Sequence, residues 1–266
     1  MKVSFIGGGN MGEAILAALI TNKLSTPEEI AVSDVSSDRQ ALLKEKYGVF
    51  TTAANAEAAA RGDIVVLAVK PQHLDPVFAD LSGRLRPGQL VLSIIAGRKI
   101  ASLSQGLKHQ SVLRAMPNTP AQIGKGITVW TASEGVTDDQ SEAARALLGV
   151  MGQAIYTHDE AVLDMATALS GSGPAYVFMF LDALIDAGVS IGLTPGMARA
   201  LTYQTVLGAT EYAERSGGDL DALRRAVTSP GGTTAAAVTV LNIGFFSLVI
   251  KQAVQAAYER AKELGS

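Results

Sequence analysis

The stretch Val3-Ser4-Phe5-Ile6-Gly7-Gly8-Gly9-Asn10-Met11-Gly12 indicates how the 266-residue chain begins to fold. Residues 3–6 predict a buried β-strand, and residues 11–22 predict a helix. The glycines between them fit the pattern G-x-G-x-x-G. In that pattern the first glycine allows a tight turn, the second lets the backbone approach a pyrophosphate, and the third lets the helix pack closely on the strand. The sequence therefore predicts a dinucleotide-binding turn at its amino end.

Short apolar runs alternate with helical patterns over the first 160 residues. The unbroken apolar run at 64–69 is typical of a strand buried on both faces of a parallel sheet. Further strands are predicted at 29–33, 49–51, 89–95, 111–115 and 127–131, and further helices at 38–47 and 138–151. This alternation predicts an α/β fold with a Rossmann-type doubly wound sheet domain over residues 1–160.

Helical patterns replace the strands after Asp159. Helices are predicted at 161–169, 175–191, 195–215, 219–228, 233–241 and 245–264. The glycines and proline of Ser170-Gly171-Ser172-Gly173-Pro174 predict a break between the first two. We expect a second, all-helical domain over residues 161–266. No Pro/Gly/Ser linker marks this boundary, so it rests on the change of period alone.

Composition narrows the class of protein. The chain has 22 Lys and Arg against 25 Asp and Glu, so it lacks the basic excess of a nucleic-acid-binding protein. It has no cysteine, which excludes disulfides, thiolate metal sites and a cysteine nucleophile. Its three histidines are widely spread and no pair has the spacing of metal ligands, so no metal site is expected.

The composition predicts a soluble protein that contacts a partner subunit. Charged residues make up only 18% of it, which favours surface hidden against another subunit. It contains no run of about 20 apolar residues, so no membrane span is expected. Its amino end lacks the apolar segment and cleavage site of a secretory signal, so a cytoplasmic location is expected.

The identity of the dinucleotide depends on the end of the second predicted strand. Asp34 lies about 20 residues beyond the glycine motif, where an acid usually holds the ribose 2′-hydroxyl of NAD. Ser33, Ser36, Ser37 and Arg39 surround it and could receive the 2′-phosphate of NADP, although a solvated loop explains the serines equally well. We expect NADPH, with NADH as a second donor.

Three more segments are expected near the cofactor because the carboxyl ends of strands line the ligand crevice of such sheets. Ala68-Val69-Lys70-Pro71 closes the fourth predicted strand, and Ala96-Gly97 closes the fifth. Met116-Pro117-Asn118-Thr119-Pro120 follows the sixth, and its two prolines predict a rigid loop over the crevice.

The segment Val227-Thr228-Ser229-Pro230-Gly231-Gly232-Thr233-Thr234 is the second conspicuous motif. Glycines before a helix start expose backbone N–H groups, and the threonines add hydroxyls. This combination suits a carboxylate ligand, although a plain helix cap with a tight turn explains it as well.

The helical half lacks a strong acid. No lysine occurs between Lys125 and Lys251. The β-hydroxyacid dehydrogenases, which the amino end resembles, use a lysine in that half as the proton carrier for a C–O bond. Reduction of an unactivated ketone would be poorly served here. A C=N bond is better suited, because its nitrogen is basic enough to arrive protonated.

The whole chain resembles the pyrroline-5-carboxylate reductase family. The resemblance is carried by Gly7 to Gly12, Leu67 to Pro71, Met116 to Pro120, Leu169 to Tyr176 and Ala226 to Thr234. It implies reduction of 1-pyrroline-5-carboxylate to L-proline by hydride transfer from NAD(P)H, the final step of proline biosynthesis. It also implies that the helical half is a dimerisation domain, that dimers assemble into decamers, and that each active site lies at the dimer interface.

The resemblance also assigns residues. Thr234 matches the threonine that contacts the ring nitrogen, here a catalytic helper, and Ser229, Gly231, Gly232 and Thr233 match the loop that holds the carboxylate. The cofactor contacts expected are Ile6, Gly7, Gly8, Gly9, Asn10, Met11, Gly12, Ser33, Asp34, Asn55, Ala68, Val69, Lys70, Pro71 and Ala96. Asp34 departs from the neutral residue of many relatives, which puts the NADPH preference in doubt but leaves the reaction unaffected.

Three alternatives remain open at this point. The chain could reduce another cyclic imine or a keto acid on the same scaffold. It could be a regulatory protein that binds NADPH without turnover. It could be a deazaflavin-linked oxidoreductase, in which case its helical half should lack the two specific loops at 169–176 and 226–234.

Overall fold

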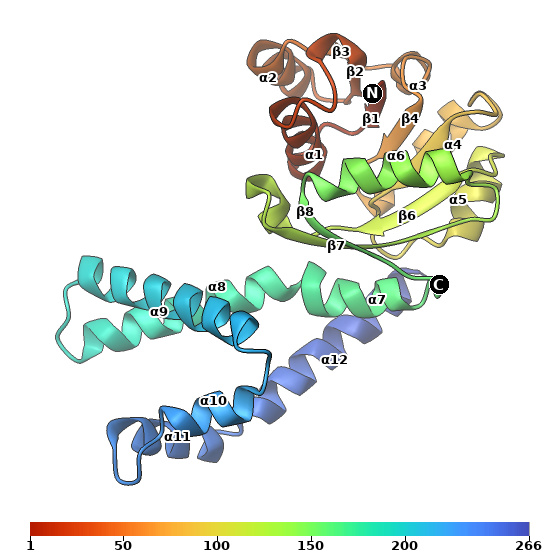
Figure 1. Cartoon of the computed structure of the whole chain (residues 1–266). Coiled ribbons are helices and arrows are strands. Elements are labelled where there is room, and N and C mark those ends of the chain that lie inside the picture. The colour runs from red at the N-terminus through yellow and green to blue at the C-terminus, as the bar shows by residue number, and fades with distance from the viewer. Residues whose placement is uncertain (266) are drawn as a thin grey trace. The chain divides into compact units, whose positions relative to one another are not determined.

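The computed structural model describes residues 1–265 and contains one eight-stranded sheet followed by helices (Figure 1). The strand order is β3-β2-β1-β4-β5-β6-β7-β8. The strands are β1 Val3–Ile6, β2 Ile30–Ser33, β3 Phe50–Thr52, β4 Ile64–Leu67, β5 Leu90–Ser93, β6 Val112–Met116, β7 Gly126–Ala132 and β8 Gly152–Tyr156. Strands β3 to β6 are parallel, and β1 pairs with both β2 and β4. The predicted doubly wound α/β fold is confirmed.

Helices cover both faces of this sheet. They are α1 Asn10–Thr21, α2 Ser37–Tyr47, α3 Asn55–Ala59, α4 Leu74–Leu81, α5 Ile100–Leu107 and α6 Asp138–Gly149. Alternate side chains of a strand point to opposite faces, so Phe5 packs in the core with α1, α2 and α6, and Ile6 packs in the core with α3, α4 and α5. Both side chains are fully buried.

The chain connectivity creates a switch point between β1 and β4. The chain runs outward from β1 through β2 to β3, then crosses back to β4 on the other side of β1. The loops after β1 and β4 therefore diverge onto opposite faces at the carboxyl edge of the sheet. In open α/β sheets such a divergence leaves a crevice that binds ligands.

The last strands differ from the simple parallel pattern. Strand β7 runs antiparallel to β6, and β8 was not predicted from the sequence. Strand β8 is short and half exposed, with Gly152 at φ +132° at its start and the polar Gln153 next. The short helices α3, α4 and α5 were also missed, because five to eight residues give too few turns for a clear helical period.

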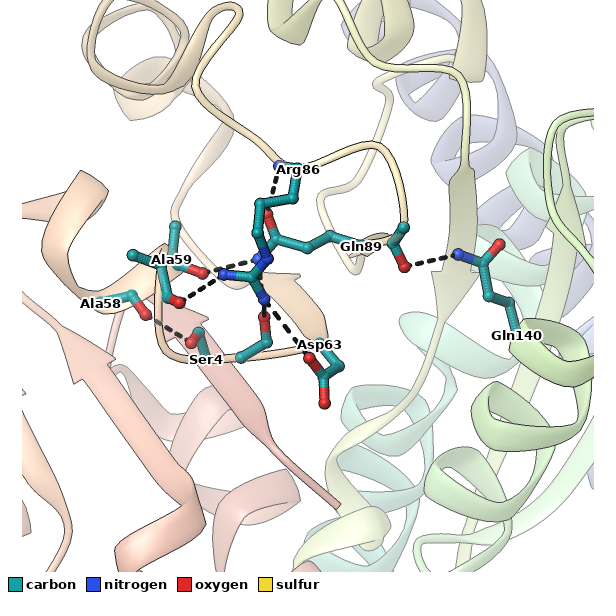
Figure 2. Close-up of polar contacts among 10 residues, drawn as sticks. Ser4, Ala58, Ala59, Asp63, Arg86, Gln89 and Gln140 are labelled. Carbon is teal, nitrogen blue, oxygen red and sulfur yellow. Dashed lines mark hydrogen bonds and ion pairs between the residues drawn. The ribbon is translucent and has the colours of Figure 1, made fainter.

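A polar network closes the amino edge of the sheet, opposite the crevice (Figure 2). The buried Gln89 side chain donates from Nε2 to the carbonyls of Ala59 (2.8 Å) and Gly62 (2.7 Å) and accepts the N–H of Arg86. The Ser4 hydroxyl donates to the carbonyl of Ala58 at 2.6 Å. These bonds give the Ala59 and Gly62 carbonyls a donor at and beyond the end of α3, and they add a second donor to the Ala58 carbonyl, which also accepts the Arg61 N–H.

A buried arginine anchors the first helix after the sheet. Arg114 of β6 is 1% exposed, and its guanidinium pairs with Glu160 (3.1 Å) and Asp164 (2.7 Å). Asp164 belongs to α7, Val162–Ala166. The same Glu160 carboxylate accepts the N–H of Ile100, the first residue of α5. The pairs offset the cost of burying the charge and fix α7 against the sheet.

The chain divides into two compact units. The first holds residues 1–174 and 257–266, and the second holds residues 175–256. Helix α7 and the π-turn Thr167–Gly171 thus belong with the sheet, and the second unit begins after Pro174. The predicted domain boundary at residue 160 remains a prediction, since it marks the end of the strands and not the end of this unit.

The predicted break at 170–174 is wrong, because a π-turn stands there in place of an interruption. The π-turn Thr167–Gly171 leads directly into α8, Gly173–Ser190, without an interruption. The N–H of Ser172 donates to the carbonyl of Thr167 at 2.8 Å, five residues back, and the hydroxyls of Ser170 and Ser172 bond helix carbonyls. The wide turn accepts Pro174, which lacks an N–H, so the proline modifies the helix and does not end it.

The second unit has almost no core of its own. Its helices are α8, α9 Pro195–Arg215, α10 Leu220–Ala226, α11 Thr233–Ile243 and the first part of α12 Phe246–Leu264. Within residues 175–256 only Ala198 and Thr202 are buried, while Phe178 and Met179 of α8 are 62% and 78% exposed. Apolar helix faces this extensive need a covering partner in water.

By length and mean hydropathy, residues 162–190 would also pass as a membrane span, with a value of 1.3. Asp182 and Asp186 lie in α8, and carboxylates are costly in lipid. The apolar faces of these helices are therefore better accounted for by a protein partner.

Candidate dinucleotide and carboxylate sites

The glycine turn between β1 and α1 has the geometry that its sequence predicts. Gly7 has φ +101°, and a β-carbon there would lie 2.8 Å from the carbonyl oxygen of Ala68. A β-carbon at Gly12 would lie 2.6 Å from the carbonyl oxygen of Gly7. Around Gly9, by contrast, no atom lies within 4 Å of where a β-carbon would be. The first and third glycines serve packing, and the second leaves the turn open to a ligand.

The start of α1 offers donors to an anion. Gly9 is the N-cap, and its residue type supplies no side chain to cap the helix. The first N–H groups of a helix lack intrahelical partners and carry the positive end of its dipole. A pyrophosphate in the crevice would therefore find backbone donors at Asn10 and Met11. The residues present fit a dinucleotide.

Two hollows form the crevice at the carboxyl edge of the sheet. One, of about 540 Å³, is lined by the ends of α1, β4 and β5, and the other, of about 430 Å³, by the ends of β1, β2 and β4. Gly9, Ala68, Val69 and Lys70 line both. The two hollows are therefore neighbours along the carboxyl edge, an elongated arrangement that suits a dinucleotide.

Most predicted cofactor residues are brought together here. The larger hollow contains Gly9, Asn10, Met11, Ala68, Val69, Lys70, Pro71 and Ala96, and the smaller adds Gly7, Ser33, Asp34 and Asn55. Ile6, Gly8 and Gly12 are buried behind the crevice and line neither hollow. These three residues support the glycine turn from beneath. Their contact with a cofactor stays a prediction.

Asp34 supports the glycine turn. Its Oδ2 accepts the N–H of Gly8 at 2.8 Å and its Oδ1 accepts the N–H of Ser36 at 2.9 Å. A carboxylate has about four acceptor sites, so Asp34 can still accept ribose hydroxyls from the hollow that it lines.

Asn55 is held in a short relay beside Asp34. It accepts the Ser33 hydroxyl at 2.8 Å and donates from Nδ2 to Asp80 at 2.8 Å. The two bonds fix which end of the amide faces each neighbour, since only the oxygen accepts and only the nitrogen donates. Asp80 of α4 was not singled out in the sequence, and no motif there indicates it.

Other crevice residues were only partly anticipated. Pro117 and Thr119 line the larger hollow, which confirms that the loop after β6 lies at the crevice. Gln122 and His73 line the two hollows and were missed. His73 ends the short turn Pro71–His73 that follows the loop after β4, so it lies close to the strand ends where such folds bind ligands.

Arg39 lies behind the turn and is engaged there. Its Nε donates to the Gly8 carbonyl and its guanidinium pairs with Glu13 of α1. Glu13 also accepts Lys46 Nζ (2.9 Å) and the Tyr47 hydroxyl (2.8 Å). Burial raises the pKa of Glu13, but the bonds from Lys46, Tyr47 and Arg39 outweigh it and lower the pKa to about 2.

The second conspicuous motif forms a tight turn in the other unit. It connects α10 to α11, with Gly231 at φ +71° and the Gly232 N–H donating to the Ser229 carbonyl at 3.0 Å. A β-carbon at Gly232 would lie 2.5 Å from the Ser229 hydroxyl oxygen. Gly232 is the N-cap of α11, so the first N–H groups of that helix face outward without a side-chain cap.

Thr233 and Thr234 occupy the first turn of α11. The turn thus places the five predicted substrate residues together at the accessible start of one helix, the kind of position that suits a carboxylate. Their roles stay a prediction. Among residues 1–265 no cluster of His, Cys, Asp and Glu suits a metal ion.

Two family models together match most of the chain. Residues 160–264 match the model described as pyrroline-5-carboxylate reductase dimerisation. Residues 2–97 match the model described as NADP oxidoreductase, coenzyme F420-dependent. The second covers only the amino-terminal fold shared with deazaflavin-linked enzymes. The first covers the helical half, where those enzymes were expected to lack the specific loops.

Relatives with the same architecture span the full length. A pyrroline-5-carboxylate reductase of Synechocystis sp. is 43% identical and aligns over 100% of this chain and 98% of its own. The structure of the Coxiella burnetii enzyme is 40% identical, with a TM-score of 0.86 over 100% of this chain and 98% of that one. A Plasmodium falciparum pyrroline carboxylate reductase with NADP bound has a TM-score of 0.92 at 30% identity, covering 100% and 98%. The chain belongs to the pyrroline-5-carboxylate reductase family.

Proposed function

We propose that the protein reduces 1-pyrroline-5-carboxylate to L-proline with NAD(P)H as hydride donor, the final step of proline biosynthesis. The observation that carries this function is the match to pyrroline-5-carboxylate reductases over the whole chain, at 43% identity and 98% of the relative's length. The crevice and the α11 turn supply a matching pair of sites, one for a dinucleotide and one for a carboxylate.

The sheet unit binds the donor. The glycine turn and the start of α1 face the pyrophosphate, Ser33, Asp34 and Asn55 face the adenosine ribose, and Ala68 to Pro71 with Ala96 face the remainder. The nicotinamide supplies a hydride to the imine carbon when bound. The protein positions the donor in a site that is lined largely by apolar side chains.

The α11 turn holds the substrate carboxylate. The N–H groups of the first helical turn and the hydroxyls of Ser229 and Thr233 are donors suited to a negative charge. Thr234 lies one residue further along the same turn, where its hydroxyl orients the imine nitrogen. A hydrogen bond to that nitrogen orients the ring for attack, so Thr234 is a helper and not an obligatory acid.

The proton comes with the substrate. Addition of a hydride to the carbon and one proton on the nitrogen converts the imine to the secondary amine. The imine nitrogen arrives protonated, which agrees with the lack of lysine between Lys125 and Lys251.

NADPH is the preferred donor, with NADH as a second. A match of residues 2–97 to an NADP oxidoreductase model and NADP in the Plasmodium falciparum relative support NADPH. Asp34 at the ribose end of the crevice is compatible with NADH, because its carboxylate retains acceptor capacity toward hydroxyls.

The helical unit forms a homodimer, and dimers assemble into a decamer. The match to a dimerisation model and the nearly coreless second unit support a dimer. Each active site then lies at the dimer interface. With its apolar faces covered in this way, the enzyme is a cytoplasmic protein with no membrane partner and no nucleic-acid partner.

A substrate comparison tests the function. Purified protein is given NADPH with either racemic 1-pyrroline-5-carboxylate or the six-membered cyclic imino acid that would give pipecolate. The proposal predicts faster turnover of the five-membered ring, with proline as the product. Turnover of the six-membered ring alone would assign the chain to another imine. Tight NADPH binding with no turnover of either would indicate a regulatory protein.

A further inference from the structure

Both polar groups of the Gly8 peptide backbone are held by side chains from the segment after β2. Its N–H donates to Asp34 Oδ2 at 2.8 Å, and its carbonyl accepts Arg39 Nε. Side chains that bind both groups of one loop residue leave that residue little freedom to rotate. We call Gly8, Glu13, Asp34 and Arg39 the Gly8 clamp.

Glu13 completes the clamp. It pairs with the Arg39 guanidinium from the first turn of α1, while Lys46 and Tyr47 bind its other oxygen. The side chains of Arg39 and Glu13 are only 23% and 17% exposed, so the pair is shielded from much of the solvent. The clamp therefore ties the start of α2 to the start of α1 across the glycine turn.

The turn needs such restraint because three glycines follow one another. Glycine has the most flexible backbone of all residue types. Fixing Gly7, Gly8 and Gly9 in one conformation therefore costs more backbone entropy than fixing three residues of another type. The C=O and N–H of a trans peptide point in opposite directions. Holding the Gly8 carbonyl toward Arg39 therefore directs the Gly9 N–H away from it. Gly9 lines both hollows of the crevice.

We propose that Arg39, held by Glu13, is a positioning residue that fixes the glycine turn in its pyrophosphate-binding shape. It sets the affinity for the pyrophosphate of the dinucleotide and does not read the 2′-phosphate. This inference rests on the proposed function only in taking a nicotinamide dinucleotide as the ligand.

The alternative role is contact with the 2′-phosphate, which the sequence allows for Arg39. In the structure its Nε and its Nη2 are committed to Gly8 and Glu13, and Arg39 lines neither hollow of the crevice. Ser33 and Asp34 line the ribose end instead. The two roles make opposite predictions for ligands that carry only one of the two phosphate groups.

Binding of four ligands to the full-length protein separates the roles. Affinities for NADPH, NADH, ADP and 2′-AMP are measured by calorimetry for the wild type, Arg39→Met, Arg39→Lys and Glu13→Gln. ADP carries the pyrophosphate without a 2′-phosphate, and 2′-AMP carries the reverse. Arg39→Met is expected to weaken NADPH, NADH and ADP alike, by about tenfold, while 2′-AMP stays within about twofold. Arg39→Lys and Glu13→Gln are expected to show the same pattern at smaller size.

Two further readouts exclude a merely structural effect. In the ligand-free protein, the Gly8 amide should exchange its hydrogen faster in Arg39→Met than in the wild type. In steady state, KM for the donor should rise while kcat stays within about twofold, since the chemistry is untouched. Arg61→Met is the matched control, because Arg61 stacks on Phe50 at 3.5 Å away from the crevice, and it should change none of the four affinities.

Two results would overturn the inference. Loss of NADPH and 2′-AMP binding with NADH and ADP unchanged would make Arg39 a 2′-phosphate ligand. Unchanged affinities for all four in a folded variant would remove any role for the clamp. Failure of the proposed function looks different, since NADPH would still bind and respond to Arg39→Met while no imine is reduced.

Discussion

Gly97, in the loop after β5, lies against the backbone of Leu264 at the end of α12. A β-carbon at Gly97 would stand 2.6 Å from the Leu264 β-carbon and 2.7 Å from its carbonyl oxygen. The neighbouring Ala96 lines the crevice. The end of the last helix thus supports a wall of the dinucleotide site, although the two are separated by most of the sequence.

Gly97→Ala should displace this wall. We expect KM for NADPH to rise by about tenfold, because the alanine must push against the Leu264 backbone and shift Ala96. Gly83→Ala is the control, since Gly83 has φ +71° against +74° at Gly97 but open space around it. It should show the strain of a left-handed alanine, about 1 kcal/mol of unfolding free energy, with an unchanged KM. Equal KM values for NADPH in the two variants would show that the contact between Gly97 and Leu264 does not shape the crevice.

Thr234→Ala should lower kcat by about tenfold to a hundredfold, as expected for loss of one orienting hydrogen bond, while the Kd for NADPH stays near the wild-type value. Thr234→Ser retains the hydroxyl and should recover most of the rate. Thr239→Ala is the control on the same helix, because its hydroxyl only bonds the Ala235 carbonyl at 2.9 Å. An equal loss of turnover and of NADPH affinity in Thr234→Ala would contradict an orienting role.

Asp34→Asn should change the choice of donor. The amide oxygen can still accept the Gly8 N–H, now bonded at 2.8 Å. The amide nitrogen cannot accept the Ser36 N–H, and the negative charge beside the ribose is removed. We expect the ratio of kcat/KM for NADPH to that for NADH to rise by about tenfold, equivalent to about 1.4 kcal/mol. Parallel assays with both donors measure it. A ratio that falls or stays constant would show that Asp34 does not face the 2′-position.

Gln89→Leu should destabilise the sheet unit without affecting the site. It leaves the Ala59 carbonyl without this donor and the Gly62 carbonyl with its bond from Arg86 alone, at the amino edge, where Gln89 is 2% exposed (Figure 2). We expect a loss of about 2–4 kcal/mol in urea unfolding, with unchanged KM. Gln140→Leu removes two exposed bonds, from the Thr137 N–H at 3.1 Å and to the Gly88 carbonyl at 3.2 Å, and should cost under about 1 kcal/mol. Similar losses of unfolding free energy in Gln89→Leu and Gln140→Leu would show that the burial of Gln89 is not the cause.

The stability of the fold should depend on Glu13 in acid. Its pKa is lowered to about 2 from the ordinary value of 4.5, so the folded state holds the carboxylate more strongly than the unfolded chain does. The stabilisation is complete above about pH 4.5 and is lost as pH falls toward about 2. We expect about 2 kcal/mol, less than the full shift implies because Lys46 is 58% exposed and solvent screens it.

Unfolding of the wild type and Glu13→Gln at a series of pH values measures this term. The difference between their unfolding free energies should be constant above about pH 5 and should shrink between about pH 4.5 and 2. A difference that is independent of pH over this range would show that Glu13 is not held as a carboxylate.

Strong local patterns made the sheet unit predictable. Val3 to Ile6 and the glycines after it forecast β1 and the turn, because apolar runs and positive φ leave clear marks in a sequence. The antiparallel β7 and the edge strand β8 leave weaker marks, since their direction and pairing are set by partners far away in the chain. The contact of Gly97 with Leu264 belongs to the same class.

The candidate site shows the same limit. Gly9, Asp34 and Lys70 could be anticipated because each follows a predicted strand in a fold whose ligands bind at strand ends. The engagement of Arg39 by Gly8 and Glu13 could not, because side-chain partners from separate helices have no fixed spacing. The sequence predicts a break at the π-turn before α8, because proline and glycine usually end helices. In the structure the hydroxyls of two serines bond the helix carbonyls there, and the helix continues.

The central claim is the reaction itself, and one assay tests it most directly. Oxidation of NADPH and of NADH is followed side by side with racemic 1-pyrroline-5-carboxylate, and proline is quantified at the end. The account predicts rapid oxidation with one proline formed for each nicotinamide consumed, and a faster rate with NADPH. No oxidation with either donor, from folded and oligomeric protein, would contradict it.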